Sequence, residues 1–457
     1  MGLAPAKPSL ALVALGCPKN TVDAEVMLGH MQKNGYRIVA KPRHADVIVV
    51  NTCAFVEDAK KESIAAVVQA AELKMQRQTK PRALFVTGCL AQRYAQELAD
   101  ELPEVDAVIG FEGYADLPSR ITRALGEEKG PHTSAQQIVV GSPTVPFREE
   151  DDRWLLTPKH SAYVRVAEGC DHNCAFCAIP GFRGTFRSKP FEVLVAEATR
   201  LVEGGARELN LIAEDTNQYG SDWGDQDSRR LPELLRVLSG ISQLKWIRLL
   251  YCYPSYFSEE LIDEIANNDK VVKYIDIPLQ HLHGDVLRRM RRPGEVTTLA
   301  LLRKLRERIP SLVLRTTFIS GFPGETREEH TTLMQRVREL GFERGGAFAY
   351  SREDGTDAAN MISQVDEATK SRRRDELSAL FEDRITKFAT SLVGKTVRVM
   401  IDRMEDTDAV GRTEFDAPEI DREIRINGMP LAPGSVLVAR VVAVDSMGDL
   451  VAEPVLL

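Results

Sequence analysis

The sequence predicts a multidomain α/β protein with three folded parts, on the strength of three observations. Strand-like apolar runs alternate with helical stretches near the N-terminus, and this alternation resumes after a segment rich in proline, glycine and charge. Short strands without helices follow near the C-terminus. The chain has 457 residues, 43% hydrophobic and 28% charged, and is long enough to bury several cores. The expected parts are an N-terminal parallel α/β sheet domain at residues 7–125, a linker at 126–155, a central partial TIM-like (β/α)6 barrel at 156–387 and a small, OB-like C-terminal β-barrel at 388–457.

Three cysteines follow three predicted strands of the N-terminal domain. The runs LALVALG, ADVIVVNT and RALFVTG lead to Cys17, Cys53 and Cys89, with helices expected at 23–33 and 57–73. The cysteines are evenly spaced, at about the length of one βα unit, roughly 30 residues or more. Because right-handed crossovers keep the carboxyl ends of parallel strands at one edge, we expect the three thiols to converge there. The alternative is three small buried hydrophobic side chains.

The central part contains six predicted strands separated by helical stretches. This repeat suits a barrel or partial barrel whose site lies at the C-terminal ends of the strands. The six segments are SAYVRVAEG, ELNLIAED, WIRLLYCYP, YIDIPLQH, LVLRTTFISGF and GGAFAYSRE.

The C-terminal part is predicted to form a small β-barrel of the kind that binds polymers. Its predicted strands are GKTVRVMIDR, AVGRTEF, SVLVARVVAVDS and DLVAEPVLL. Residues 391–457 contain 7 Lys or Arg against 12 Asp or Glu, and the whole chain has a formal charge of -8. A nucleic-acid barrel is usually basic, so this composition favours a basic partner instead.

Three further cysteines form a tight motif, C-x3-C-x2-C, at Cys170, Cys174 and Cys177. A closed zinc site and an ordinary iron–sulfur cluster both need four ligands, so three thiolates leave one metal position open to a small molecule. His172, inside the motif, is an alternative fourth ligand, although a solvent-facing loop position suits it better. Zinc is the other alternative, but the paired C-x2-C signature of zinc sites is absent.

This motif, with aromatic Phe176 before its last cysteine and a six-unit βα segment around it, resembles the radical S-adenosylmethionine (SAM) superfamily. The resemblance implies a 4Fe–4S cluster held by Cys170, Cys174 and Cys177, whose open iron binds SAM. In that superfamily the cluster cleaves SAM to a 5′-deoxyadenosyl radical, which abstracts hydrogen from an unactivated carbon. The cofactor supplies this chemistry, and the protein supplies placement and exclusion.

The stretches VALGCPKNTVDAE, NTCAF and VTGCLAQRY, taken with the triplet, look like the methylthiotransferases over nearly the whole chain. The resemblance implies that Cys17, Cys53 and Cys89 hold a second, auxiliary 4Fe–4S cluster with its own open iron, which carries or activates the inserted sulfur. It also implies that one SAM donates the methyl group and another forms the radical. The C-terminal barrel resembles the TRAM domain, which engages the substrate polymer in this family.

Four segments, GCPKN, VNTCAFVEDAKKESI, IAEDTNQYG and IDIPLQH, resemble the RimO type of methylthiotransferase. That type modifies the β-carbon of an aspartate in ribosomal protein S-twelve. The tRNA-modifying MiaB type usually reads GCQMN at the first cysteine and is the alternative. The acidic barrel independently favours a basic ribosomal protein over a tRNA backbone. One departure is Glu214, where the family leads us to expect glutamine.

Several SAM contacts are carried over from the resemblance, each with a plain turn or structural residue as the alternative. Phe176 of the cluster motif is one of them. Ala213, Glu214 and Asp215 fall at the family's amino-group site, and Ser320 and Gly321 resemble the glycine-bearing turn near the adenine. The remaining candidates at expected strand ends are Arg248, Gln280 and His281. Two more arginines, Arg183 and Arg187, follow the cluster motif. They either shield the cluster, hold a carboxylate or belong to a solvated loop. Cys252 is expected to be a packing residue.

The expected partners are ribosomal protein S-twelve or the small ribosomal subunit, a low-potential electron donor and a sulfur donor. We expect a monomer, with tRNA as a partner only under the MiaB alternative. No apolar stretch approaches the roughly 18–20 residues of a membrane span, and the N-terminus lacks a signal-peptide pattern, so a cytoplasmic enzyme is expected. A non-catalytic iron–sulfur carrier or ribosome-binding protein is the remaining alternative.

Overall fold

The structure is a computed structural model that describes residues 7–76, 81–126, 136–145, 153–224 and 226–455. The chain divides into two compact units. The first contains the N-terminal part through Leu156 together with Glu168–His172 and Cys177–Arg187. The second contains Thr157–Ala167, Asn173–Phe176 and Ser188–Leu457. No helix in the described segments is both long and apolar enough to cross a membrane.

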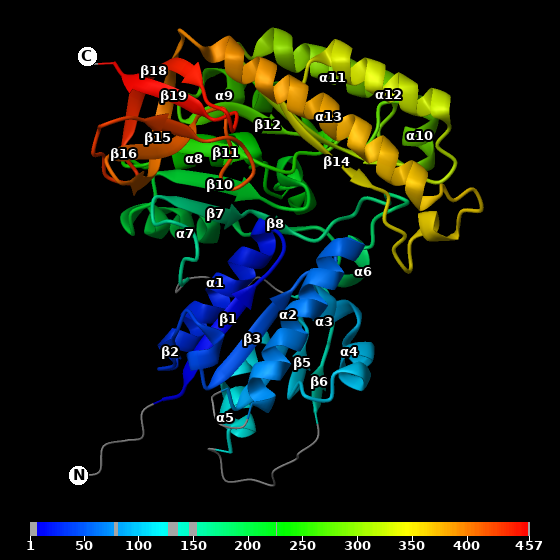
Figure 1. Ribbon diagram of the computed structural model, residues 1–457, viewed down its shortest axis with the longest axis vertical. Helices are drawn as coiled ribbons and strands as arrows, with labels where there is room; N and C mark the ends of the chain where they lie inside the picture. Colours follow the sequence, from blue (N-terminus) through cyan, green and yellow to red (C-terminus); the bar gives the residue numbers. More distant parts are fainter. Residues whose placement is uncertain (1–6, 77–80, 127–135, 146–152, 225, 456–457) are drawn as a thin grey trace. The chain divides into compact units, whose positions relative to one another are not determined.

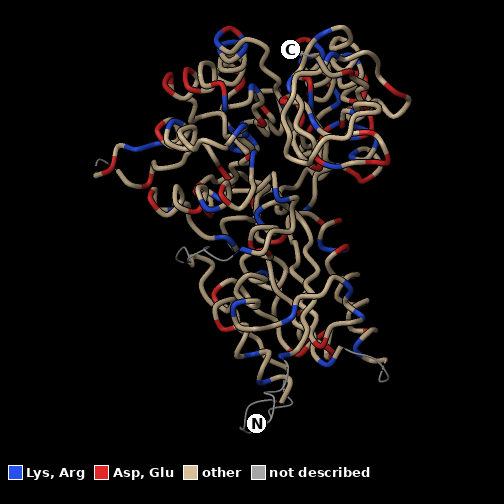
Figure 2. Tube along the Cα trace, turned by 90° about the vertical axis from the view of Figure 1, so that its left-hand side faces the viewer, with Lys and Arg blue, Asp and Glu red and all other residues tan. Residues whose placement is uncertain are grey.

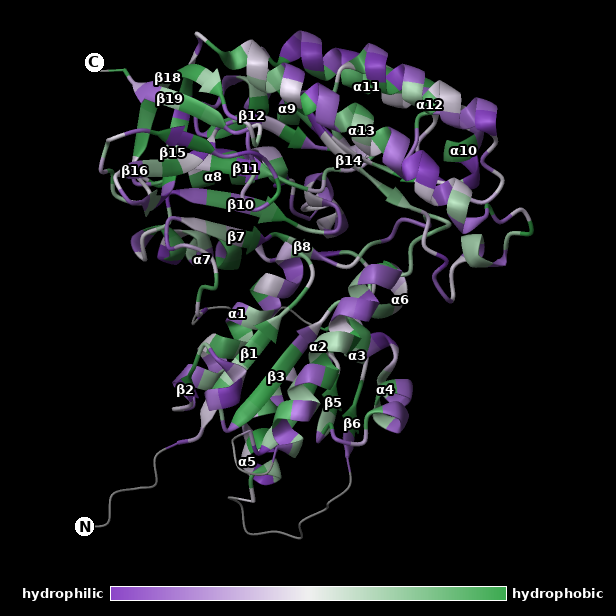
Figure 3. Cartoon of the chain, viewed as in Figure 1, coloured by the Kyte–Doolittle hydropathy of each residue, from purple (hydrophilic) through white to green (hydrophobic). Residues whose placement is uncertain are grey.

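The first unit is built on a six-stranded parallel sheet in the order β2-β1-β3-β4-β5-β6 (Figure 1). Its two central strands are fully buried, and Figure 3 shows β3 as mostly apolar, the pattern of a parallel strand covered on both faces. The strands are β1 Ser9–Ala14, β2 Arg37–Ile38, β3 Val47–Thr52, β4 Ala83–Gly88, β5 Ala107–Ile109 and β6 Gln137–Val139. The helices are α1 Pro18–Lys33, α2 Glu57–Met75, α3 Cys89–Arg93, α4 Ala95–Glu101, α5 Leu117–Ala124 and α6 Ile179–Arg183, with 3-10 turns at Pro42–His44 and Phe111–Asp116.

The linker expected at residues 126–155 is wrong in part. Its segment Gln137–Val139 forms the edge strand β6, which pairs in parallel with β5. Farther on, the backbone N–H of Trp154 donates to the carbonyl of Glu25, and the Arg153 guanidinium pairs with the Glu25 carboxylate. These contacts tie the end of the expected linker to α1. The other parts of that range, residues 127–135 and 146–152, lie outside the described residues.

The second unit contains the predicted central barrel, an open parallel sheet in the order β14-β13-β12-β11-β10-β7. All six predicted strands are present, at β7 Ser161–Arg165, β10 Glu208–Ile212, β11 Trp246–Leu249, β12 Val271–Asp276, β13 Val313–Ser320 and β14 Arg344–Ala349. The helices are α7 Phe191–Glu203, α8 Leu231–Ser239, α9 Glu259–Asn267, α10 Gly284–Arg289, α11 Glu295–Arg308, α12 Arg327–Leu340 and α13 Glu367–Leu392. Shorter elements are β8 Ala167–Glu168, β9 Arg187–Ser188 and the 3-10 turns Thr216–Gln218, Ser221–Trp223, Pro254–Tyr256 and Asp357–Asn360. Helix α13 continues past the expected boundary at residue 387, so the barrel domain passes into the next domain through a helix.

The C-terminal barrel is closed and has five strands in the order β15-β16-β17-β19-β18. They are β15 Thr396–Glu405, β16 Asp408–Thr413, β17 Ile424–Ile426, β18 Val436–Val444 and β19 Leu450–Pro454. Figure 2 shows acidic and basic residues interspersed over this barrel. Some of its acidic side chains are paired with basic neighbours; Arg403, for example, pairs with Glu405 and Glu423.

A buried ion network joins the C-terminal barrel to the central sheet. Arg412 of β16 lies 2.9 Å from the Glu208 carboxylate on β10 and 2.8 Å from Asp402 on β15. Arg248 of β11 reaches the other Glu208 oxygen at 3.1 Å. Burial opposes ionisation of Glu208, but the two arginines outweigh it and hold its pKa below the ordinary value. The two domains therefore dock through paired charges as well as apolar contact.

Replacing Arg412 with methionine should loosen this docking, because it leaves the buried Glu208 and Asp402 carboxylates without a shared cation. We expect a loss of about 3–5 kcal/mol, seen as a lower urea midpoint of unfolding. The matched control is Arg403→Met on the same barrel, whose side chain is 44% exposed in its pairs with Glu405 and Glu423. The control should change stability by no more than about 1 kcal/mol. Equal midpoints for the two variants would show that the buried network does not stabilise the interface.

Candidate functional site

The first candidate centre lies where three neighbouring strands of the N-terminal sheet end. Strands β1, β3 and β4 are adjacent, and Cys17, Cys53 and Cys89 directly follow their carboxyl ends or the short turns after them. Burial raises the pKa of the Cys53 thiol to about 11, with a further contribution from Cys17. Burial also raises the pKa of Cys89 to about 12, and both other thiols add to this. The structure therefore brings the three cysteines close enough to interact, as predicted.

Asn20 on α1 forms hydrogen bonds around this centre. Its side-chain amide donates to the carbonyls of Leu15 at 3.1 Å and Thr52 at 2.8 Å, which fixes the turns before Cys17 and Cys53. Its Oδ1 accepts a hydrogen bond from the Cys89 thiol at 3.4 Å. Gly16 makes the close approach possible, since it has φ +92° and a Cβ there would lie 2.6 Å from the Cys53 Cβ.

This donor set suits a cluster of soft metal ions. The three ligand atoms are all cysteine sulfurs, which select iron–sulfur clusters, zinc or Cu(I) over hard cations. A buried thiol with a raised pKa stays protonated until a metal displaces its proton, as coordination does outright. With three sulfurs in place, a 4Fe–4S cluster would keep one iron without a protein ligand. The residues present therefore fit the implied auxiliary cluster.

The second cysteine set, Cys170, Cys174 and Cys177, lies in the loop after β8 and is partly exposed at all three positions. In the first unit, the backbone N–H of Cys170 donates to the Gly184 carbonyl at 3.1 Å. In the second unit, the Arg292 guanidinium lies 3.7 Å from the Cys174 sulfur, and the residue after Cys174 is held by a backbone bond to Met290 at 3.0 Å. Partial exposure suits thiolates whose metal must meet a small molecule.

Phe176, the aromatic residue of the motif, packs against a small apolar cluster of the second unit. The cluster contains Val286, Met290, Phe322 and Tyr350. Phe322 belongs to the turn after β13, so the motif and this turn share one apolar support. His172, the alternative fourth ligand, is half-buried.

The candidate SAM contacts at Ala213, Glu214 and Asp215 directly follow β10. Ala213 and Asp215 are fully buried, whereas Glu214 is partly exposed. The next residue, Thr216, donates its backbone N–H to the Tyr251 carbonyl at 3.0 Å, which joins this loop to the one after β11. These positions thus lie at the C-terminal end of β10, next to the loop that follows its neighbour β11.

Ser320 and Gly321 form a tight turn after β13. The Ser320 hydroxyl donates to the Lys370 carbonyl at 3.2 Å, and the Gly321 N–H donates to the Glu325 carboxylate. Gly321 has φ +72°, and a Cβ there would lie 2.4 Å from the Lys370 Cγ, so glycine is required on both counts.

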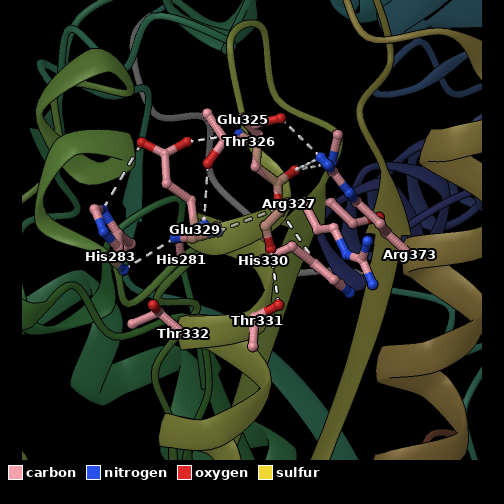
Figure 4. Close-up of polar contacts among 12 residues, drawn as sticks. His281, His283, Glu325, Thr326, Arg327, Glu329, His330, Thr331, Thr332 and Arg373 are labelled. Atoms are coloured by element: carbon pink, nitrogen blue, oxygen red, sulfur yellow. Dashed lines mark hydrogen bonds and ion pairs between the residues drawn. The ribbon is translucent and has the colours of Figure 1, made fainter.

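Glu325 anchors this turn within a buried set of charged side chains (Figure 4). Its carboxylate lies 3.5 Å from ring nitrogens of His281 and His330 and 3.3 Å from Arg373. Burial opposes its ionisation, but the two nearby histidines and the Arg373 charge outweigh it and lower the Glu325 pKa to about 2. His281 is thus a buried structural partner of the turn, the alternative that the sequence left open. Gln280 beside it has φ +69° and forms a β-bridge with Phe318.

The expectation that Arg248 faces the barrel mouth as a SAM contact is wrong. Arg248 is fully buried inside β11, donates to the Glu414 carbonyl of the C-terminal barrel at 3.1 Å and pairs with Glu208. A lone strand sequence does not show which carboxylate from a distant domain its arginine meets. Cys252 is buried as expected, but it lies three residues beyond the end of β11 rather than within a strand.

Sequence reasoning missed Asn20, Asp23 and Arg292, which contact cysteines of the two motifs or their neighbours. Asn20 is part of the quoted stretch GCPKN, so its nearness to Cys17 in the sequence was an available signal. Arg292 lies far from Cys174 in sequence, and only the fold brings the two together. Arg187 donates to backbone carbonyls of Val145 and Thr185 and pairs with Glu168, so it fixes its own loop.

Comparison with known proteins agrees with this architecture. Family models match for uncharacterized protein family UPF0004 at residues 9–110, the radical SAM superfamily at 164–337 and the TRAM domain at 393–455. Three curated relatives named ribosomal protein uS12 methylthiotransferase RimO come from Desulforamulus reducens, Geobacter sulfurreducens and Caldanaerobacter subterraneus. They are 42%, 43% and 44% identical, over 97%, 98% and 97% of this chain and 99% of each relative.

The chain belongs to the RimO family of methylthiotransferases. It is therefore a radical SAM enzyme that uses an iron–sulfur cluster and SAM. Solved structures share the fold: the radical SAM methyltransferase TsrM from Kitasatospora setae (TM-score 0.52, 14% identity, 77% of both chains) and the cobalamin-dependent radical enzyme OxsB (TM-score 0.52, 12% identity, 84% of this chain and 57% of that chain). For a RimO-family chain, the predicted order of sheet domain, radical SAM barrel and TRAM barrel is confirmed.

Proposed function

We propose that this enzyme inserts a methylthio group at the β-carbon of an aspartate in ribosomal protein uS12, using two 4Fe–4S clusters and two SAM molecules. The observation that carries the proposal is the presence of two separate sets of three cysteines in a chain that matches RimO relatives over nearly their full length. One set supports SAM binding and the other supports a sulfur-carrying centre. Both leave one iron free of protein ligands.

The protein's own residues would hold and shield these groups. Cys170, Cys174 and Cys177 would bind the first cluster, and the turn at Ser320–Gly321 together with the loop after β10 would receive SAM at the strand ends. When bound, this cluster supplies the electron that cleaves SAM. Cys17, Cys53 and Cys89 would hold the second cluster, which would supply the site for the sulfur to be inserted.

The substrate class follows from the relatives and from charge. The relatives are named as methylthiotransferases of ribosomal protein uS12, and residues 391–457 carry more acidic than basic residues, which favours encounter with a basic ribosomal protein. A ribosomal substrate places the reaction in the cytoplasm, away from any membrane. The further partners are a low-potential electron donor and a sulfur donor, and the enzyme acts as a monomer.

Mass analysis of ribosomal proteins and of tRNA from cells lacking this enzyme tests the proposal. We expect uS12 to lose the mass of one methylthio group, and complementation with the intact gene to restore it. Methylthio-adenosine in tRNA should stay unchanged in both strains. If the tRNA modification disappears while uS12 stays the same, the enzyme is of the tRNA-modifying type, and if neither changes, a carrier role replaces catalysis.

A further inference from the structure

One buried arginine, Arg183, lies beside the sulfur of Cys89 in the N-terminal centre. It ends α6 and is only 3% exposed. Its Nη2 donates to Asn20 Oδ1 at 2.7 Å and to Asp23 Oδ2 at 2.8 Å, and it lies 3.4 Å from the Cys89 sulfur. The guanidinium also stacks over the Phe111 ring at 4.3 Å from its centroid.

The burial of this cation needs a reason, because a buried guanidinium is costly unless it is paired and hydrogen-bonded. Asp23 supplies one negative partner, and Glu168 supplies a second at 3.7 Å. The sulfur of a coordinating cysteine is a third, since a metal-bound thiolate accepts charge-assisted hydrogen bonds. A thiolate at Cys89 would therefore add a further negative partner to the Asp23 and Glu168 carboxylates.

The position of Arg183 in the chain is also informative. It follows Cys177, a ligand of the proposed SAM-binding cluster, by a single short helical turn. The segment Cys177–Arg187 belongs to the same compact unit as the N-terminal sheet. One short segment therefore runs from Cys177, a ligand of the proposed SAM-binding cluster, to Arg183, which contacts Cys89 of the N-terminal centre.

We propose that Arg183 is a positioning residue of the Cys17–Cys53–Cys89 centre and sets its reduction potential through the hydrogen bond to the Cys89 sulfur. This inference rests on the proposed function, which assigns a cluster to these cysteines. Hydrogen bonds to cluster sulfurs and nearby charge are recognised determinants of cluster potential. Reduction adds negative charge, so a buried cation favours the reduced state and raises the potential, while the Asp23 carboxylate acts in the opposite direction.

The test uses the full chain with Cys170, Cys174 and Cys177 replaced by alanine, so that only the second centre holds iron. In this background, Arg183→Met should lower the midpoint potential, measured by redox titration with electron paramagnetic resonance. Asp23→Asn should raise it, and Arg183→Lys should fall between Arg183→Met and the background because it keeps the charge but loses the fork of donors. Opposite shifts from two variants that both break one buried ion pair separate an electrostatic role from general damage.

A matched control is Arg153→Met, which breaks another buried pair on α1, that of Arg153 with Glu25. It should leave the potential unchanged.

Iron and sulfide contents show whether a negative result overturns the proposed function or only the role of Arg183. If the background protein holds no cluster, the proposed function falls, and this inference falls with it. If the cluster is present but Arg183→Met leaves its potential unchanged, or both variants shift it the same way, only the role of Arg183 is overturned. Should Arg183→Met lose the cluster, the Asp23→Asn result alone decides: a higher potential supports the role, and an unchanged one overturns it.

Discussion

Replacing Cys17, Cys53 and Cys89 together with alanine should abolish methylthio transfer while leaving cleavage of SAM at least partly intact. The three thiols lie at the ends of β1, β3 and β4, away from the C-x3-C-x2-C motif in the sequence. Their loss removes the proposed sulfur-carrying cluster but no ligand of the SAM-binding cluster. Iron content should fall from about eight to about four atoms per chain. Deoxyadenosine should still form with SAM and a strong reductant, whereas uS12 should stay unmodified.

The matched control for this variant is Cys252→Ala. Cys252 is buried, and burial raises its pKa well above the ordinary value, as expected of an inert packing thiol. Its replacement should leave iron content and methylthio transfer essentially unchanged. If the three-cysteine variant keeps all of its iron, the N-terminal centre holds no cluster, and the cysteines are small buried side chains after all.

Continuous apolar strands made most of the fold predictable. β3, β4, β7, β10 and β11 are fully buried strands with mostly apolar side chains, which locate them in the sequence, whereas β14 is partly exposed along most of its length. The strands that the sequence did not reveal are short, such as β6 Gln137–Val139 and β17 Ile424–Ile426. Three residues are too few to show a periodicity, and such strands form only because a neighbouring strand offers its edge.

The residues of the candidate site were likewise only partly predictable from the sequence. Cysteines at strand ends were predictable because strand ends of a parallel sheet must share an edge. The partners of Arg183 and Arg248 were not, since Asp23 and Glu414 lie more than a hundred residues away from them in the sequence. Local sequence shows that an arginine is present, but only the packed structure shows which distant groups it meets, the Asp23 carboxylate for Arg183 and the Glu414 carbonyl for Arg248. Sequence reasoning consequently located the cysteines at the strand ends but not the charged residues that surround them.

Replacing Cys170, Cys174 and Cys177 with alanine should have the larger effect, because every later step depends on the radical made from SAM. This variant loses all protein ligands of the SAM-binding cluster, so deoxyadenosine formation should fall to background and uS12 should remain unmodified. Iron content should again fall to about four atoms per chain, now held by Cys17, Cys53 and Cys89. The informative comparison is between the two three-cysteine variants: equal iron but opposite behaviour toward SAM means two centres with separate tasks. Residual SAM cleavage in the Cys170, Cys174 and Cys177 variant would instead mean that the N-terminal cysteines bind the SAM-cleaving cluster, and the assignment of the two centres would have to be exchanged.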